Sequence, residues 1–240
     1  MFHRLLDLSS PENWSSKREE LLLRGFVAFP EFASPYTVDR LTAEADVLIT
    51  NATADGVYGV VQDVRGEVLV MNRIDKVSDY LFDLARHPVM MTVAERLLGK
   101  PAMSLHVEYF CKPREHSSPT PPHQDHIFYE EHFDDELAIS LWIALDDVGP
   151  DSGALEYSTP SPMQLLPHIQ SPAIDFDFQL TETTGFSFVQ APVPRGGCVA
   201  HHSYAVHRAG YNQSGVQRRA IAFNYRGSDY RAWLKSKDAK

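Results

Sequence analysis

Residues 137–145 read Leu-Ala-Ile-Ser-Leu-Trp-Ile-Ala-Leu, a long apolar run near the middle of the chain. Its length and its mixture of β-branched, aromatic and aliphatic side chains predict a buried strand. Shorter runs of the same kind, separated by turn signals, lie at 104–110, 153–157, 187–191, 197–202 and 219–225. Several short strands at this spacing favour a sandwich or barrel over alternating strands and helices.

The first hundred residues show a different pattern, which is mainly helical. Ser34-Pro35 offers a capping hydroxyl followed by proline at the first helical position, and helices are also predicted at 79–85 and 88–98. A strand is expected at 26–29 and a hairpin within 57–74. We therefore predict one domain over residues 1–240 that is mainly β with flanking helices. Residues 1–100 would form a helical support layer and residues 101–230 a double-stranded β-helix (jelly-roll, cupin-like) core.

Composition and net charge indicate which partners and which cellular compartment to expect. The 240 residues fit one domain, and a net charge of -10 argues against nucleic acid, whose binders present a basic face. No apolar run approaches a membrane span, and the first residues lack the pattern of a secretory signal. With only two cysteines, the chain is expected to be cytoplasmic and to act on a small molecule, without nucleic-acid or membrane partners. Its oligomeric state cannot be read from the sequence.

The motif Pro-Pro-His-Gln-Asp at 121–125 carries the first candidate metal ligands. His123 and Asp125 are two residues apart, so on an extended segment both side chains point the same way while Gln124 points away. A bare His-x-Asp pair is a weak signal, but a second histidine-rich region follows, with His201, His202 and His207 as candidates. Two imidazoles and one carboxylate would form the facial triad of non-haem Fe(II) oxygenases.

A second candidate feature is the adjacent pair Arg218-Arg219, which precedes the apolar run Ala-Ile-Ala-Phe. On a strand, one arginine of the pair faces inward and the other faces out. A buried arginine needs an anionic partner, and a bidentate bond to a carboxylate would supply it. An inward guanidinium near a metal would suit the far carboxylate of a dicarboxylic co-substrate. The alternative is a solvated surface patch.

Four segments, in this order, resemble the phytanoyl-CoA dioxygenase (PhyH) family of Fe(II)/2-oxoglutarate-dependent oxygenases. The resemblance is carried by Arg24-Gly25-Phe26-Val27, by Pro122-His123-Gln124-Asp125 with Phe128-Tyr129, by 141–148 with Ser152-Gly153-Ala154-Leu155, and by His202, His207, Asn212-Gln213-Ser214 and Arg218-Arg219-Ala220. The order of these four segments along the chain is specific.

The resemblance implies a cofactor set and a role for each matching residue. Fe(II) would be held by His123, Asp125 and His207, and the C5 carboxylate of 2-oxoglutarate by Arg218. Lys112 falls near the expected co-substrate pocket, with Tyr129 and Trp142 as pocket walls, although Trp142 equally suits a core position. With O2, such an enzyme hydroxylates or otherwise oxidises a C–H bond and releases succinate and CO2. Asp125 favours hydroxylation over halogenation, because related halogenases lack this carboxylate.

Two segments depart from the family pattern. Ala209 stands where members often carry a small hydroxyl residue that contacts the co-substrate, and Thr159-Pro160-Ser161-Pro162 replaces Gly-Ser-His. Substrate contacts are expected from His126, His202 and Arg195, which would suit a polar or anionic metabolite, while His201 is expected to face outward. A fatty acyl-CoA does not follow from the family name.

Two other functions remain open for the same residues. A metal-dependent hydrolase could use the same ligands with a bound water, but it would have no need of Arg218. A non-catalytic jelly-roll binding module would be favoured by loss of a ligand, and all three ligands are present.

Overall fold

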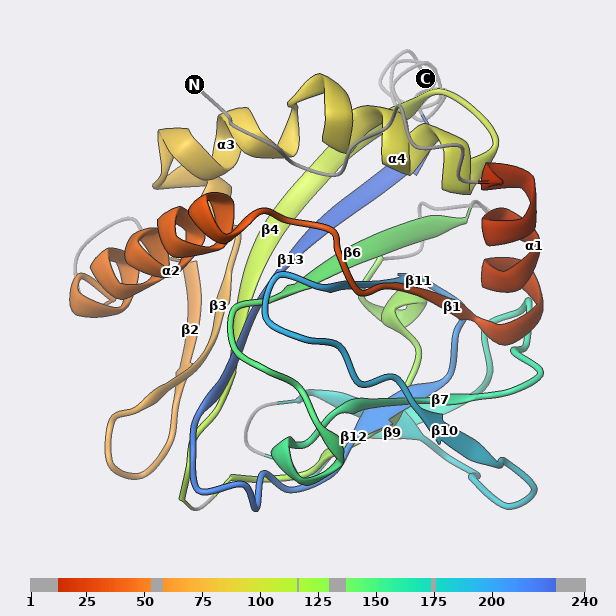
Figure 1. Cartoon of the computed structure of the whole chain (residues 1–240). Coiled ribbons are helices and arrows are strands. Elements are labelled where there is room, and N and C mark those ends of the chain that lie inside the picture. Colours follow the sequence, from red (N-terminus) through yellow and green to blue (C-terminus); the bar gives the residue numbers. More distant parts are fainter. Residues whose placement is uncertain (1–12, 53–57, 116, 130–136, 174–175, 228–240) are drawn as a thin grey trace, which may run out of the picture.

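A computed structural model describes residues 13–52, 58–115, 117–129, 137–173 and 176–227 of the chain, and Figure 1 shows its architecture. Four α-helices precede most of the strands: α1 (Trp14–Arg24), α2 (Pro35–Thr50), α3 (Asp79–Ala85) and α4 (Pro88–Leu98). Within the described residues, no helix combines the length and the apolar character needed to cross a membrane.

Two antiparallel sheets pack against each other, as expected for the jelly-roll fold. The larger sheet has seven strands in the order β1 (Phe26–Phe29), β11 (Cys198–His202), β6 (Ala138–Ala144), β13 (Arg218–Gly227), β4 (Ala102–Lys112), β3 (Val68–Asn72) and β2 (Tyr58–Gln62). The smaller sheet runs β10 (Phe188–Gln190), β7 (Leu155–Ser158), β12 (His207–Ala209) and β5 (Thr120–His123). Strands β8 (His168–Gln170) and β9 (Phe178–Leu180) form a separate pair.

The central strand β6 is buried on both faces, which explains its uninterrupted apolar sequence. Its alternate side chains enter two different cores. Leu141 and Ile143 join a core formed with the helices, whereas Trp142 and Ala144 join the core between the two sheets. The helices therefore cover one face of the larger sheet, and the other face is left for the site described below.

The helix boundaries follow the predicted capping signals. The Ser34 hydroxyl accepts a hydrogen bond from the Thr37 amide at the start of α2, and Pro35 occupies the first turn. Gly99 ends α4 in the left-handed conformation, with φ of 73°.

The predicted division at residue 100 does not match the sheets. Strands β1, β2 and β3 come from the first hundred residues but form the two edges of the larger sheet, so the helical layer and the strand core share this segment. Thr120–His123 forms strand β5 although it contains two prolines, and His207 begins strand β12. Because β5 lies at the edge of its sheet, Pro121 and Pro122 are tolerated there without breaking the sheet's hydrogen-bond ladder.

Candidate metal centre and adjoining cavities

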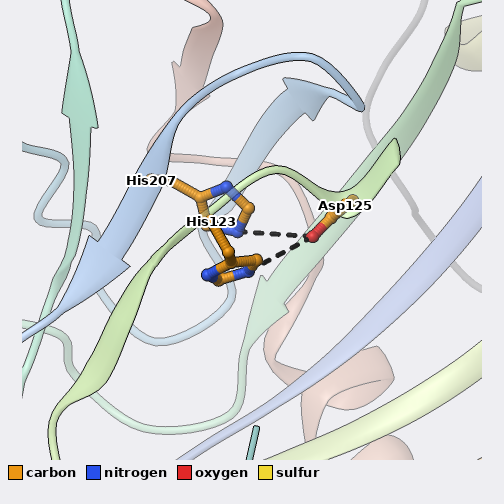
Figure 2. A group of neighbouring side chains, drawn as sticks. All are labelled: His123, Asp125 and His207. Carbon is orange, nitrogen blue, oxygen red and sulfur yellow. Dashed lines mark ion pairs between the residues drawn. The ribbon is translucent and has the colours of Figure 1, made fainter. Parts of the chain in front are cut away.

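The smaller sheet brings the three predicted metal ligands together. His207 on β12 pairs in register with His123 on β5, so the two imidazoles project from the same face. Asp125 follows at the start of the short 3₁₀ helix η2 (Asp125–Phe128). Its Oδ1 lies 3.5 Å from Nε2 of each histidine, and the three potential ligand atoms all lie within 4.8 Å of one another. Figure 2 shows both rings directed at this carboxylate.

Backbone carbonyls fix which nitrogen of each imidazole faces the centre. Nδ1 of His123 lies 2.8 Å from the Pro121 carbonyl, and Nδ1 of His207 lies 3.0 Å from the Ala205 carbonyl. Carbonyl oxygens only accept, so both Nδ1 atoms carry the hydrogen and both Nε2 lone pairs point toward Asp125. This second contact is the usual support of a metal-bound histidine. Two imidazole nitrogens and one carboxylate oxygen are the donor set preferred by non-haem Fe(II).

The protonation states also suit a metal. Burial, reinforced by the neighbouring His123, holds the pKa of His207 well below its usual range, despite the opposing effect of Asp125. Burial alone would raise the pKa of Asp125, but the imidazoles of His207, His123 and His201 hold it well below the usual value. A neutral imidazole and an ionised carboxylate are the forms that bind metal, so no proton has to leave these two groups at neutral pH.

Gln124, between the two ligands, faces away from the metal centre as predicted. Its amide nitrogen donates to the carbonyls of Gln164 and Tyr204, and its carbonyl accepts from the Leu166 amide at 2.7 Å. The side chain is fully buried and therefore ties the ligand segment to two neighbouring loops.

His201 and His202 occupy the opposite positions from those predicted. His201, expected to face outward, is only 3% exposed, and its Nε2 lies 2.9 Å from Asp125 Oδ2. His202, expected to contact substrate, points to the other face of β11, toward the helix-side core that contains Cys198 and Ala200. Strand alternation shows that only one of two adjacent histidines can face the site. It does not show which, and nothing in the local sequence separates the two.

The candidate co-substrate residues line one cavity with the metal ligands. The cavity is lined by Arg218, Lys112 and Trp142 together with His123, Asp125, His201 and His207. The Arg218 guanidinium lies 5.2 Å from the Trp142 ring centroid and donates to the Gly153 carbonyl at 3.2 Å. Its neighbour Arg219 faces away and forms a two-point ion pair with Asp146.

Two buried cations meet at the far end of this cavity. Arg218 on β13 is directly opposite Lys112 on β4, and the two residues are 3% and 4% exposed. The Lys112 ammonium donates to the Ser118 carbonyl, and the Arg218 guanidinium donates to the Gly153 carbonyl. Like charges opposite each other on neighbouring strands still repel, so an anionic group at this end of the cavity would lower that repulsion.

A second cavity adjoins the first and shares several lining residues with it, Asp125 and Glu108 among them. One wall is aromatic: Phe128 and Phe176 pack edge to face at 5.4 Å, and Tyr129 also lines the space. The Tyr129 side chain is 8% exposed, and burial raises its pKa well above the usual range, so the phenol stays protonated. The polar lining includes Asn72, Arg73, His106, Glu108 and Asp177.

None of the three predicted substrate residues lines either cavity. His126 stacks on Tyr204 and bonds to Ser203 on the far side of η2, and His202 faces the helices. Arg195 pairs with Asp39 of α2 at 2.8 Å. The polar groups that do line the second cavity were missed, although β4 carries a usable signal. Lys112 was predicted at the pocket, and stepping back by two residues along the strand gives Phe110, Glu108 and His106.

Comparison with known sequences gives a consistent match. A family model described as Phytanoyl-CoA dioxygenase (PhyH) matches residues 22–220. Phytanoyl-CoA dioxygenase domain-containing protein 1 of Danio rerio is 30% identical over 120 residues, which are 47% of this chain and 40% of that protein. The match thus spans less than half the length of the curated relative.

Solved structures share the fold over nearly the whole chain. The 2-oxoglutarate complex of EvdO2 from Micromonospora carbonacea var. aurantiaca has a TM-score of 0.70 at 24% identity, covering 89% of this chain and 90% of that one. SnoN, a non-heme alpha ketoglutarate dependent epimerase from nogalamycin biosynthesis, gives 0.71 at 23%, covering 91% and 84%. EctD from S. alaskensis, with 2-oxoglutarate and 5-hydroxyectoine, gives 0.75 at 16%, covering 95% and 81%. At these identities the likeness shows the jelly-roll fold.

Proposed function

Because the chain belongs to the phytanoyl-CoA dioxygenase (PhyH) family, we propose that it is an Fe(II)- and 2-oxoglutarate-dependent dioxygenase that hydroxylates, or otherwise oxidises, a C–H bond of a small molecule. One observation carries the proposal: the His123–Asp125–His207 cluster and the buried Arg218–Lys112 pair line the same cavity. Relatives of this fold with 2-oxoglutarate bound support it.

Each half of the cavity has a separate task. His123, Asp125 and His207 hold Fe(II), and Arg218 binds the far carboxylate of 2-oxoglutarate through charge-assisted hydrogen bonds, with Lys112 adding positive charge from β4. The wall of Trp142 packs beside the guanidinium and limits its movement. When bound, Fe(II) and 2-oxoglutarate supply, with O2, the oxidising chemistry that yields succinate and CO2. The residues supply orientation and a site shielded from water.

The second cavity is the proposed substrate site, because it meets the metal centre at Asp125. The polar residues that line this cavity take the role of substrate contacts, which the sequence had predicted for other residues. Arg73 makes no ion pair within the described part of the chain, and its backbone is held in the left-handed region at φ of 54°. Glu108 accepts a hydrogen bond from the Asn224 amide at 2.9 Å, and its carboxylate lies 3.4 Å from His106 Nε2, so this acidic group has contacts other than Arg73. The free guanidinium favours a substrate that carries an anionic group, with an apolar part against Phe128 and Phe176.

A substrate panel tests this preference. Small aromatic carboxylic acids and their matched amides would be compared by succinate release. The acids should be turned over faster by the native protein, and Arg73→Gln should remove the preference while Arg73→Lys keeps most of it. Equal turnover of acids and amides by the native protein would contradict the anionic-substrate proposal.

The cofactor assignment is tested by anaerobic titration with Fe(II) and 2-oxoglutarate, followed by visible absorption. A weak metal-to-ligand charge-transfer band is expected in the native protein. Arg218→Ala should raise the concentration of 2-oxoglutarate needed for half of the band by about 10- to 100-fold, because a charge-assisted bond is lost. The matched control is Arg219→Ala, which changes the neighbouring arginine outside the cavity. Bound iron without any band would reject the 2-oxoglutarate assignment and favour the hydrolase.

A further inference from the structure

The two oxygens of Asp125 have different surroundings. Oδ1 lies 3.5 Å from Nε2 of both His123 and His207, whereas Oδ2 lies 2.9 Å from Nε2 of His201. The other ring nitrogen of His201, Nδ1, lies 2.9 Å from the Tyr157 hydroxyl. A chain of hydrogen bonds therefore runs from Tyr157 through His201 to the side of the carboxylate that faces away from the two ligand imidazoles.

The direction of these hydrogen bonds follows from the Asp125 carboxylate, at which the series of hydrogen bonds ends. An ionised carboxylate only accepts, so Nε2 of His201 must donate to Oδ2. In a neutral imidazole the other nitrogen then carries no hydrogen, so Nδ1 accepts and the Tyr157 hydroxyl donates. Tyr157 is itself held in place: it is fully buried on β7 and its ring stacks on Phe26 with centroids 4.3 Å apart.

We propose that His201, oriented by Tyr157, is a positioning residue that holds Oδ2 of Asp125 away from the metal, so that Asp125 binds the ion through Oδ1 alone. The inference rests on the metal centre of the proposed function, but not on 2-oxoglutarate or on any substrate. Two imidazoles and a monodentate carboxylate fill three of six positions around an octahedral ion and leave three open. A carboxylate that bound through both oxygens would close one of them. Outer hydrogen bonds of this kind commonly orient metal ligands.

The number of open positions can be counted with Mn(II) as the probe. Each open position on bound Mn(II) takes a water, which shortens the longitudinal relaxation time of the solvent protons. In the native protein loaded with Mn(II), three waters are expected. In His201→Phe, Oδ2 is released and can reach the ion, so the relaxivity per bound Mn(II) should fall by about a third. In His201→Gln, the amide can still donate to Oδ2, and the relaxivity should return toward the native value.

The direction of the change in relaxivity distinguishes a positioning role for His201 from a role as a metal ligand. An increase in relaxivity in His201→Phe would show that His201 is itself a ligand, and an unchanged value at full Mn(II) occupancy would show that it does not control Asp125. Either result overturns the proposal. If His201→Phe does not fold, Tyr157→Phe can replace it, because this change keeps the ring packing and removes only the hydroxyl. A decrease in relaxivity is again expected, and an unchanged relaxivity would overturn the proposal. Failure of the native protein to bind Mn(II) would instead reject the metal centre.

Discussion

His202 is a fully buried histidine with no hydrogen-bond partner for either ring nitrogen within the described residues. Its position on β11 places it on the face that packs against the helices, opposite Ile139 of β6. Burial of an imidazole without partners opposes folding, because the ring gives up its hydrogen bonds to water. Burial, reinforced by the nearby His201, lowers the pKa of His202 to about 3.

His202→Leu should therefore stabilise the protein. At pH 7 the free energy of unfolding should rise by about 1 kcal/mol, because an apolar side chain replaces an unsatisfied one. The native protein should also lose stability as pH falls from 6.5 toward 3, because over this range the unfolded chain takes up a proton that the buried ring refuses. The variant should lose less. Denaturant unfolding at pH 7 and pH 5 measures both effects, and a less stable variant would mean that His202 has a partner.

At the scale of residues, the step of two along a strand placed His123 and Asp125 of the candidate metal centre on one side, whereas the choice of His207 came from the resemblance to the family. Alternation also shows that only one of Arg218 and Arg219 can face inward, and the choice of Arg218 came from the resemblance to the family. The adjacent pair His201-His202 marks where this reasoning ends, because both residues are imidazoles and only their place in the sheet tells them apart. The partner of His201, Tyr157, comes from another strand and has no signal near either histidine.

At the scale of elements, the pairing of β5 with β12 suggests what compensates for Ala209. Ala209 lies directly opposite Thr120 in the strand register, and both residues line the cavity that holds the metal ligands. The hydroxyl that family members often carry on the strand of the distal histidine can therefore be supplied by the neighbouring strand. We propose that Thr120 provides the hydrogen bond to 2-oxoglutarate.

Thr120→Val, which keeps the shape and removes the hydroxyl, should weaken 2-oxoglutarate binding by about fivefold, in line with one lost hydrogen bond of about 1 kcal/mol. Adding Ala209→Ser in the same protein should restore much of the affinity. Titration of the charge-transfer band measures both variants. Native affinity in Thr120→Val would show that the hydroxyl takes no part.

The elements themselves were largely predictable, and the exceptions have a common cause. Helices α2 and α4 begin and end at the capping residues that the sequence displays, and β6 follows its apolar run. Strand β5 was hidden because two prolines normally argue against a strand, and only its position at a sheet edge makes them acceptable. Whether a strand lies at an edge depends on the assembled sheet, so the four residues of β5 alone do not indicate it.

At the scale of the whole molecule, the larger sheet lies between the helical layer and the candidate site. Helices cover one of its faces, and the smaller sheet covers part of the other (Figure 1). Residues from both sheets line the cavity. Because β1, β2 and β3 come from the N-terminal part and complete the edges of this sheet, the support layer cannot be separated from the core at residue 100. This pairing joins segments far apart in the chain, which is why composition alone suggested a simpler division.

Calorimetry can test the claim that the metal cluster and the Arg218–Lys112 pair form one ligand site. 2-Oxoglutarate would be titrated into metal-free protein and into protein loaded with Mn(II). We expect at least about tenfold tighter binding with metal, because one molecule would contact both ends of the cavity. The coupling should be equal when the order of addition is reversed. His207→Ala should abolish this gain, whereas Arg218→Ala should weaken binding with or without metal. Equal affinity in the presence and absence of metal would contradict the claim.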